Sequence, residues 1–394
     1  MRDESYASVQ TVSDQQPKAS VKVAANAIED TARAVTALLD ELDAEHAKLT
    51  MVFYGGDHDD KVIARALDST TGARGVAGTT AGELSCKGFS HNSMTGMSFH
   101  GDGVRAAVEI VPKLRQLSLV PIVHLPGKLA RGIGRSKSEL DPERHLWLFM
   151  VDGHSGKEGL LTPFFMQAAP RLGLVGASLG DGEDFRHARV AHHGRVYRDA
   201  AAAILLEYDS PFETFKHTHM ELTDRHVEVT KVSGGGRILE QLDGKLAQVV
   251  YAEALGIDPS QVTAATVAKF PLGYRFRGRP FPVSVLRIRN DGTFRLASSV
   301  QHGEQLSILE PNDLVGSTHR AIDEAIDALT ARGCKAEALL LFHCIARYIE
   351  ARHEGKVDAL ADALCQGPTC GLNTYGEQFE TLHMNHSLTG VIFG

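Results

Sequence analysis

Three short segments of this sequence place a carboxylate directly after a glycine. They are Gly78-Thr79-Thr80-Ala81-Gly82-Glu83, Gly176-Ala177-Ser178-Leu179-Gly180-Asp181 and Gly371-Leu372-Asn373-Thr374-Tyr375-Gly376-Glu377. Glycine permits backbone conformations that other residues resist. A carboxylate just past such a bend lies at a strand end, where ligands are often bound. We therefore expect one structural device used three times, with the three loops facing a shared site.

A ligand resembling an amino acid needs a cation for its carboxylate and an anion for its ammonium. Arg347 can form a planar two-donor clamp on a carboxylate. Glu83 or Glu377 can hold the ammonium, and Asn385 and Thr374 can add hydrogen bonds. In the alternative, the glutamates bind turn amides and Arg347 pairs with a structural carboxylate, because buried charge seldom stays unpaired. The candidate ligand-binding residues are Gly78, Thr80, Glu83, Ser178, Asp181, Arg347, Thr374, Tyr375, Glu377 and Asn385.

A serine hydrolase is the competing enzyme interpretation, since the stretch 176–180 fits the G-x-S-x-G pattern with Ser178 as nucleophile. That nucleophile elbow requires a helix straight after the serine. Here Asp181-Gly182-Glu183-Asp184 follows, which is a poor helix interior. The equivalent position in the first segment is Thr80. We therefore expect a protein that is not an enzyme, with the hydrolase kept as an alternative.

The 19 histidines raise the possibility of haem. Haem needs an apolar slot, an axial ligand such as neutral imidazole, and cations for its propionates. His383 is the first candidate ligand because it lies beside the third glycine segment, and His343, at the end of an apolar run, is the second. The alternative is that most histidines are solvated. Polar runs that suit this alternative contain His58, His187, His192, His193, His217, His219 and His226.

Two further chemistries are disfavoured. Cys365 and Cys370 form one loose pair that Cys344 could join, whereas structural zinc usually needs two close pairs, so we expect reduced thiols. The sequence has no G-x-x-x-x-G-K-[ST] phosphate loop. The glycine run 233–236 lacks its lysine, which disfavours nucleotide hydrolysis.

Composition and charge narrow the class of protein. A chain of 394 residues predicts two domains, and 43% hydrophobic with 23% charged residues is typical of a soluble globular protein. A net charge of −8 disfavours nucleic-acid binding and gives no attraction to anionic membrane. No signal-peptide core or membrane-spanning run of ~18 apolar residues is present. We therefore expect a cytoplasmic protein, and five sparse cysteines suit that compartment.

Hydrophobic periodicity predicts repeated strand-helix-strand-strand units. After a flexible tail over residues 1–20, we expect a helix over 21–48, a strand over 49–54, a helix over 59–67 and a strand over 75–84. The same order recurs from residue 145 to 180. Gly78 aligns with Gly176 and Glu83 with Asp181 without gaps, which indicates an internal duplication.

The glycine run 233–236 also suggests a junction between two domains, residues 21–230 and 231–394. In the second domain we expect helices over 245–255, 317–331 and 357–364 and a strand over 338–342. The closing segment should form two further strands. The predicted fold class is mixed α/β, with two domains of layered sheets and helices.

These motifs resemble the FIST family of bacterial sensory proteins, with an N-terminal and a C-terminal FIST domain from about Ala32 to the end. The residues that carry the resemblance are Gly78 to Glu83, Gly176 to Asp181, Leu242-Asp243-Gly244 to Tyr251, Cys344 with Arg347, Gly371 to Glu377, and His383-Met384-Asn385. The resemblance implies a two-part FIST N and FIST C chain that senses a small ligand. It includes a nitric-oxide-sensing NosP branch that binds haem and regulates histidine kinases or cyclic-di-GMP enzymes.

We therefore expect a cytoplasmic sensor that signals through a partner protein. Haem with nitric oxide is the first ligand hypothesis, and the partner would be a histidine kinase or a cyclic-di-GMP enzyme. An amino-acid-like metabolite is the alternative ligand, and a hydrolase at Ser178 is the alternative function. Nucleic acid and membrane are not expected as partners.

Overall fold

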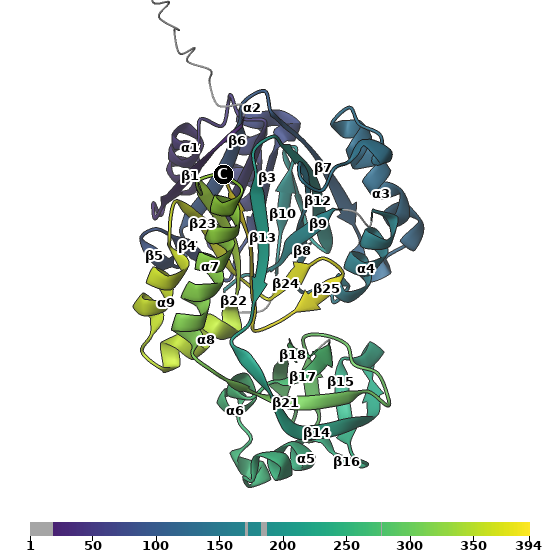
Figure 1. The fold of residues 1–394 in the computed structure, drawn as a ribbon. Coiled ribbons are helices and arrows are strands. Elements are labelled where there is room, and N and C mark those ends of the chain that lie inside the picture. The colour runs from purple at the N-terminus through teal and green to yellow at the C-terminus, as the bar shows by residue number, and fades with distance from the viewer. Residues whose placement is uncertain (1–18, 170–171, 183–186, 277) are drawn as a thin grey trace, which may run out of the picture.

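The computed structural model describes residues 19–394 apart from 170–171, 183–186 and 277. The chain forms a large body of three six-stranded sheets and a smaller, mainly β domain (Figure 1). The smaller domain comprises residues 220–311 and interrupts the part of the chain that builds the third sheet. The predicted mixed α/β class is confirmed. No helix in the described ranges is long and apolar enough to cross a membrane.

The first sheet carries two helices on its outer face. Its strands, in spatial order, are β1 (Ser20–Asn26), β6 (Met94–His100), β2 (Leu49–Tyr54), β3 (Gly75–Thr79), β10 (Val190–His192) and β11 (Arg195–Tyr197). The helices are α1 (Thr31–Glu41) and α2 (Asp60–Thr71). Side chains alternate along each strand. Met51 and Phe53 therefore face the centre of the body, while Val52 and Tyr54 pack under the helices.

The second and third sheets repeat this plan. The second contains β25 (Leu382–Met384), β24 (Gly376–Phe379), β9 (Gly173–Leu179), β8 (His145–Asp152), β12 (Ala200–Tyr208) and β7 (Val104–Pro112), with α3 (Leu119–Gly132) and α4 (Glu158–Ala168) outside. The third contains β13 (Phe212–His217), β26 (Leu388–Phe393), β22 (Ala338–Cys344), β23 (Thr369–Thr374), β4 (Glu83–Ser85) and β5 (Gly88–Ser90). Its helices are α7 (Leu314–Ala331), α8 (Ile345–His353) and α9 (Val357–Leu364).

Each sheet is completed by a hairpin from another third of the chain. Hairpin β4–β5 leaves the first third to join the third sheet, β10–β11 leaves the second third to join the first sheet, and β24–β25 leaves the last third to join the second sheet. The exchange is cyclic: each third of the chain forms one repeated unit, and the sheet of each unit includes a hairpin donated by another unit. The predicted duplication is thus part of a threefold repeat.

The inner faces of the three sheets share one apolar core. Phe53 of the first sheet meets Phe342 of the third with ring centroids 6.3 Å apart, and Phe99 meets Phe393 at 5.0 Å. Gly78 of the first sheet packs against Met150 and Leu179 of the second sheet. A Cβ added there would lie 2.6 Å from Met150 Cε, well inside contact distance, so glycine is required for packing.

The inserted domain has an antiparallel sheet and its own core around Tyr251 and Phe294. Its elements are β14 (Met220–Ser233), β15 (Ile238–Leu242), β16 (Lys245–Leu246), α5 (Ala247–Leu255), α6 (Ala264–Lys269), β17 (Leu272–Phe276), β18 (Arg279–Val283), β19 (Val285–Ile288), β20 (Phe294–Leu296) and β21 (Gln305–Pro311). Two short segments join it to the large body, one between β13 and β14 and one between β21 and α7.

Several boundaries differ from the expected ones. The predicted helix over 21–48 is strand β1 followed by the shorter α1, because Val21 and Val23 alternate with polar residues and pair with β6. Helix α3, which contains Pro121 and Pro126, was not expected. The glycine run 234–236 is a turn between β14 and β15 rather than a junction, and the third unit begins at β13. The predicted tail over 1–20 lies almost wholly outside the described residues.

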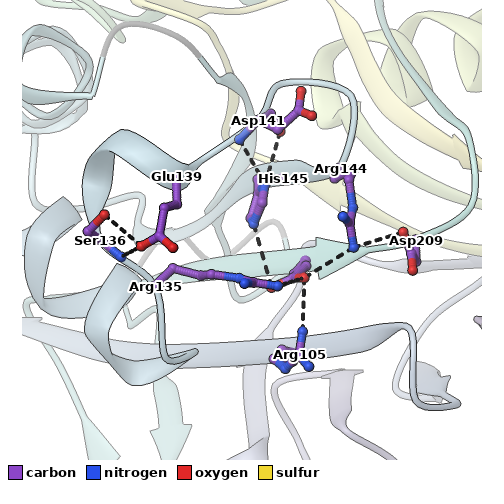
Figure 2. A network of polar contacts seen from close by, with 9 residues as sticks. Arg105, Arg135, Ser136, Glu139, Asp141, Arg144, His145 and Asp209 are labelled. Atoms are coloured by element: carbon purple, nitrogen blue, oxygen red, sulfur yellow. Dashed lines mark hydrogen bonds and ion pairs between the residues drawn. The ribbon is translucent and has the colours of Figure 1, made fainter.

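A buried carboxylate ties the second sheet to α3 at one end. Glu207 Oε1 lies 2.7 Å from Arg135 Nη2 and 3.0 Å from Arg105 Nη1, and Arg144 approaches it at 3.4 Å. Figure 2 shows these arginines and His145 converging from different elements. Burial alone would raise the pKa of Glu207, but the hydrogen bond and charge of Arg135 and the charge of Arg105 lower it.

This network predicts a measurable loss of stability for Glu207→Gln, because three guanidinium groups would lose their shared anion. We expect a cost of about 2 kcal/mol in unfolding free energy by denaturant titration at pH 7. A folded pKa below the unfolded value stabilises only above the unfolded pKa. The cost should therefore shrink as the pH falls below about 4. Glu253→Gln, which removes the exposed pair with Lys245, is the control and should change stability by less than about 0.5 kcal/mol. Equal effects of both variants would contradict the network's role.

Candidate functional site

The three glycine segments meet at one end of the three sheets. The backbone N–H of Ala81 donates to Asn373 O at 2.9 Å, that of Tyr375 to Ser178 O at 2.8 Å, and that of Gly182 to Thr80 O at 3.1 Å. Each loop is therefore hydrogen-bonded to the next in a ring.

The ring itself leaves no room for a ligand. A Cβ added at Gly180 would lie 2.8 Å from Tyr375 Cε1 and 3.0 Å from Ala81 Cβ. The loops thus converge as expected, but they pack on one another and do not line a pocket among themselves. A cleft lies beside the ring, and Tyr375 of the third loop forms part of its lining.

Glu83 and the hydroxyls around it form the first of two similar buried cages. Its carboxylate accepts hydrogen bonds from the hydroxyl of Thr80, from Ser93 N at 3.0 Å and from Ser93 Oγ at 2.8 Å. The side chain is 1% exposed, and burial raises its pKa. This glutamate is saturated by its own loop and does not reach a ligand ammonium.

Glu377 repeats the arrangement in the third unit. The hydroxyls of Thr374 and Ser387 donate to its two oxygens. Burial raises the pKa of Glu377 to about 8, although both hydroxyls oppose the shift. The hydroxyl three residues before the acid was part of the sequence motif. The serine ten residues after it was missed, although Ser93 and Ser387 give the same spacing.

The second loop departs from this pattern. Asp181 accepts from Tyr375 OH at 2.6 Å and lies 3.4 Å from His154 Nε2. Ser178 lies within β9 and is 1% exposed. Its hydroxyl donates to Glu158 at 3.4 Å and accepts from Gln378 at 2.8 Å. Ser178 therefore has neither the exposed turn nor the imidazole contact of a nucleophile elbow.

Arg347 is wholly buried and has no carboxylate within 4.0 Å among the described residues. Its guanidinium contacts His219 Nδ1 at 3.0 Å and the hydroxyl of Thr318, and its Nε has no partner in this part of the chain. Burial lowers its pKa to about 10, opposed by the charge of Glu350. Arg347 is thus neither an accessible clamp nor half of a direct ion pair.

A cleft of about 530 Å³ opens beside the loop ring, between the inserted domain and the large body. We call it the interdomain cleft. Its walls come from α6 and β19 on one side and α8 with the third loop on the other. Its lining is Ala264, Ala265, Ala268, Lys269, Ser284, Val285, Leu286, Cys344, Ile345, Ala346, Ile349, Glu350, His353, Glu354, Tyr375, Asn385 and His386. Tyr375 and Asn385 are the two predicted site residues that line it.

The interdomain cleft is mainly apolar but carries opposite charges. Lys269 lies on the α6 wall and Glu350 on the α8 wall. Burial raises the pKa of Glu350, while electrostatic interactions with His386 and Arg347 oppose the shift. Its carboxylate lies 2.9 Å from His219 Nε2, which connects it to the buried Arg347. Sequence reasoning missed both charges because neither lies near a glycine motif.

The two predicted haem ligands each contact a side-chain amide. His343 is fully buried, with Nδ1 2.8 Å from Asn373 Oδ1 and its ring 5.5 Å from that of Phe89. His383 Nδ1 lies 3.2 Å from Gln378 Nε2. Neither lines the interdomain cleft, where an apolar macrocycle could enter. In the described ranges no three His, Cys, Asp or Glu side chains gather as a metal site.

His386 is the histidine that combines burial with access to the cleft. It lines the cleft wall, and its Nδ1 has no hydrogen-bond partner among the described residues. Burial lowers its pKa to about 3, so the ring is neutral at physiological pH. Its position directly after His383-Met384-Asn385, which carries part of the family resemblance, was a usable sequence signal.

The Glu377 cage predicts a pH-dependent stability. A carboxyl whose folded pKa exceeds its unfolded value stabilises the fold fully below the unfolded pKa and loses that effect as pH rises through the folded pKa. Wild-type protein should lose a few kcal/mol between pH 5 and pH 8.5, and Glu377→Gln should lose markedly less. Unfolding free energy from denaturant titration at both pH values gives the comparison, with Glu253→Gln as control. Parallel pH profiles for wild type and Glu377→Gln would contradict it.

Comparison with solved structures gives only weak likenesses. The crystal structure of cyanuric acid hydrolase from A. caulinodans matches 95% of this chain and 99% of that chain at 11% identity, with a TM-score of 0.37. Phosphoribosylformylglycinamidine synthase II from Thermotoga maritima matches 95% of this chain and 72% of that chain at 10% identity, with a TM-score of 0.20. Neither score supports an argument about fold or function. A comparison with curated proteins finds no relative of this chain.

Family models match most of the sequence. The FIST N domain model matches residues 48–245, and the FIST C domain model matches residues 247–380. FIST domains are small-ligand sensing domains of signalling proteins. The boundary between the two models falls inside the inserted domain, beside β16 and α5. With both models matched in order and over more than half of its length, this chain belongs to the FIST family.

Proposed function

We propose that this protein senses a small ligand in the interdomain cleft and transmits its presence through the angle between the two domains. The observation that carries the proposal is the origin of the cleft walls. Helix α6 and β19 belong to the inserted domain, whereas α8 and the third loop belong to the large body. A ligand that touches both walls binds best at one domain angle, and differential affinity of this kind shifts a conformational equilibrium.

The lining favours a small zwitterion with an apolar side chain. Glu350 is placed to accept the ammonium and Lys269 to attract the carboxylate, while Ile345, Ile349 and Val285 offer apolar surface. Polar groups that fix orientation in a mainly apolar pocket are typical of small-molecule sites. An amino-acid-like metabolite therefore becomes the first ligand hypothesis, with Glu350 and Lys269 in the roles expected of Glu83, Glu377 and Arg347.

The cleft is connected to the loop ring by direct contacts. Ser298 of the inserted domain donates to Asn385 Oδ1 at 3.4 Å, and Asn385 Nδ2 donates to Tyr375 O at 3.0 Å. A ligand that displaces Ser298 from Asn385 would loosen one contact between the domains. The signal would pass to a partner protein, and the family resemblance suggests a histidine kinase or a cyclic-di-GMP enzyme.

Haem with nitric oxide is the second candidate, and its support is His386. The neutral ring lines an apolar cleft, its buried Nδ1 has no partner among the described residues, and Lys269 would face a propionate. Axial imidazole, apolar walls and a nearby cation are the groups that haem requires. His386 would then replace His383 and His343 as the ligand.

Filling the cleft should abolish sensing of an apolar amino acid. We expect leucine, isoleucine, valine, methionine or phenylalanine in millimolar excess to raise the melting temperature of wild-type protein, because a ligand selective for the folded state stabilises it. Ala268→Trp should remove this rise by occupying the space between α6 and α8. Ala331→Trp, on an exposed position of α7, is the matched control and should keep it.

A charge-removing variant, Lys269→Gln, provides a second test of amino-acid binding in the interdomain cleft. Lys269→Gln should weaken an amino acid more than its carboxamide, because only the acid carries the charge that Lys269 attracts. A ligand response that survives Ala268→Trp unchanged would place the binding site outside the cleft.

Reconstitution with haemin separates the two candidates. If haem is the ligand, purified protein should acquire a Soret band that is lost in His386→Ala and kept in His383→Ala, since only the first ring lines the cleft. The matched pair also tests the sequence prediction, which expects the opposite order. Absence of any Soret band at stoichiometric haemin would eliminate haem.

A further inference from the structure

A second hollow of about 370 Å³ lies on the other side of the two connecting segments. We call it the cationic pocket. Figure 1 shows β18 of the inserted domain facing β25 of the large body in this region, whereas α6 faces α8 at the interdomain cleft. Its lining is Lys216, His217, Thr218, His219, Met220, Glu221, Arg279, Pro280, Phe281, Pro282, Asn312, Ser317, Arg320, Met384 and Ser387.

Positive charge dominates this pocket. Lys216, Arg279 and Arg320 face one lining carboxylate, Glu221, which accepts from Asn312 Nδ2. Neither Lys216 nor Arg279 has a carboxylate within 4.0 Å in the described part of the chain, and Arg320 reaches Asp313 only at 4.0 Å. The three cations come from β13, β18 and α7, so both domains contribute. Unbalanced charge from three directions is the arrangement that binds an anion with several oxygens.

Lys216 is held in place for such a role. Its Nζ lies 4.8 Å from the ring centroid of Phe281 and 5.3 Å from that of Phe379, one from each domain. Burial lowers its pKa, the charge of Arg279 lowers it further, and Glu380 opposes the shift. The two pocket histidines are neutral, since burial lowers the pKa of His217 to about 3 and that of His219 well below its ordinary value.

We propose that the cationic pocket is a second binding site, specific for a small organic phosphate. Its phosphoryl oxygens would be bound by Lys216, Arg279 and Arg320, and its apolar body would rest on Phe281, Pro282 and Met384. The phosphate bridges the two domains because Arg279 belongs to one and Lys216 and Arg320 to the other. This site is separate from the proposed ligand cleft and does not depend on it.

The two sites share one dividing wall. In the segment 384–387, Met384 and Ser387 line the cationic pocket, while Asn385 and His386 line the interdomain cleft. Thr218 Oγ1 donates to His386 O at 2.8 Å across this wall. His219 lines the pocket on one side and contacts Glu350 of the cleft on the other. A phosphate bound in the cationic pocket would therefore lie against the same segment that lines the interdomain cleft.

A different arginine cluster serves as the internal comparison. Arg287, Arg289 and Arg295 surround an open hollow on the inserted domain. All three lie on one domain, and Arg289 is already 3.7 Å from Asp291. Without walls from two domains or an aromatic surface, this cluster offers charge alone, so the cationic pocket is the better site.

Calorimetric titration of the full chain with phenyl phosphate tests the proposal, with phenol as the neutral probe. We expect saturable binding of phenyl phosphate alone, weakened at least ~10-fold by Arg279→Gln and by Arg320→Gln. Both arginines are exposed, so the variants should fold. Arg65→Gln makes the same charge change on the distant α2 and should bind like wild type.

Two further measurements distinguish phosphate binding in the cationic pocket from binding elsewhere on the protein. Ala268→Trp should leave phenyl phosphate binding unchanged, which distinguishes this site from the interdomain cleft. Phenyl phosphate should also slow amide hydrogen exchange over residues 217–220, because it joins the two domains beside that segment. No binding, binding insensitive to Arg279→Gln, or binding lost instead in Arg287→Gln would overturn the proposal.

Discussion

The cyclic exchange of hairpins is the constraint on which the rest of this structure depends. Because β4–β5, β10–β11 and β24–β25 each complete another unit's sheet, the three sheets are held around one apolar core. The exchange also explains where the glycine loops lie. Each loop leads from a central strand into the donated hairpin, so all three must cross between sheets at the same end of the body.

The hairpin exchange also explains the positions of the two buried glutamates. Glu83 and Glu377 stand at or near the start of donated hairpins, and each is hydrogen-bonded by hydroxyls before and after it in its own unit. These acids are hydrogen-bonded within the crossing segments, whereas Tyr375, Asn385 and α8 line the interdomain cleft. A motif that suggested binding chemistry thus has a structural role next to the interdomain cleft.

The sequence allowed the local elements and the repeated motif to be predicted, but not the site. Strand β2, helix α2 and the bend at Gly82-Glu83 follow from hydrophobic period and glycine placement, which are local properties. The cleft depends on an inserted domain that places Lys269 opposite Glu350, residues far apart in the chain with no shared motif. Hairpin exchange likewise depends on contacts between distant parts of the chain, which local sequence patterns do not reveal. His343 shows the limit clearly, because an apolar strand places its ring in the core instead of a pocket.

The donated hairpins also affect how the chain is made. The second sheet is incomplete without β24–β25, and the third is incomplete without β26. All three strands come from residues 376–393. A ribosome adds these residues after the strands that they complete, so the edges of those strands stay unpaired until then. Such edges invite wrong partners. The second and third sheets should therefore close only once β24, β25 and β26 have been made.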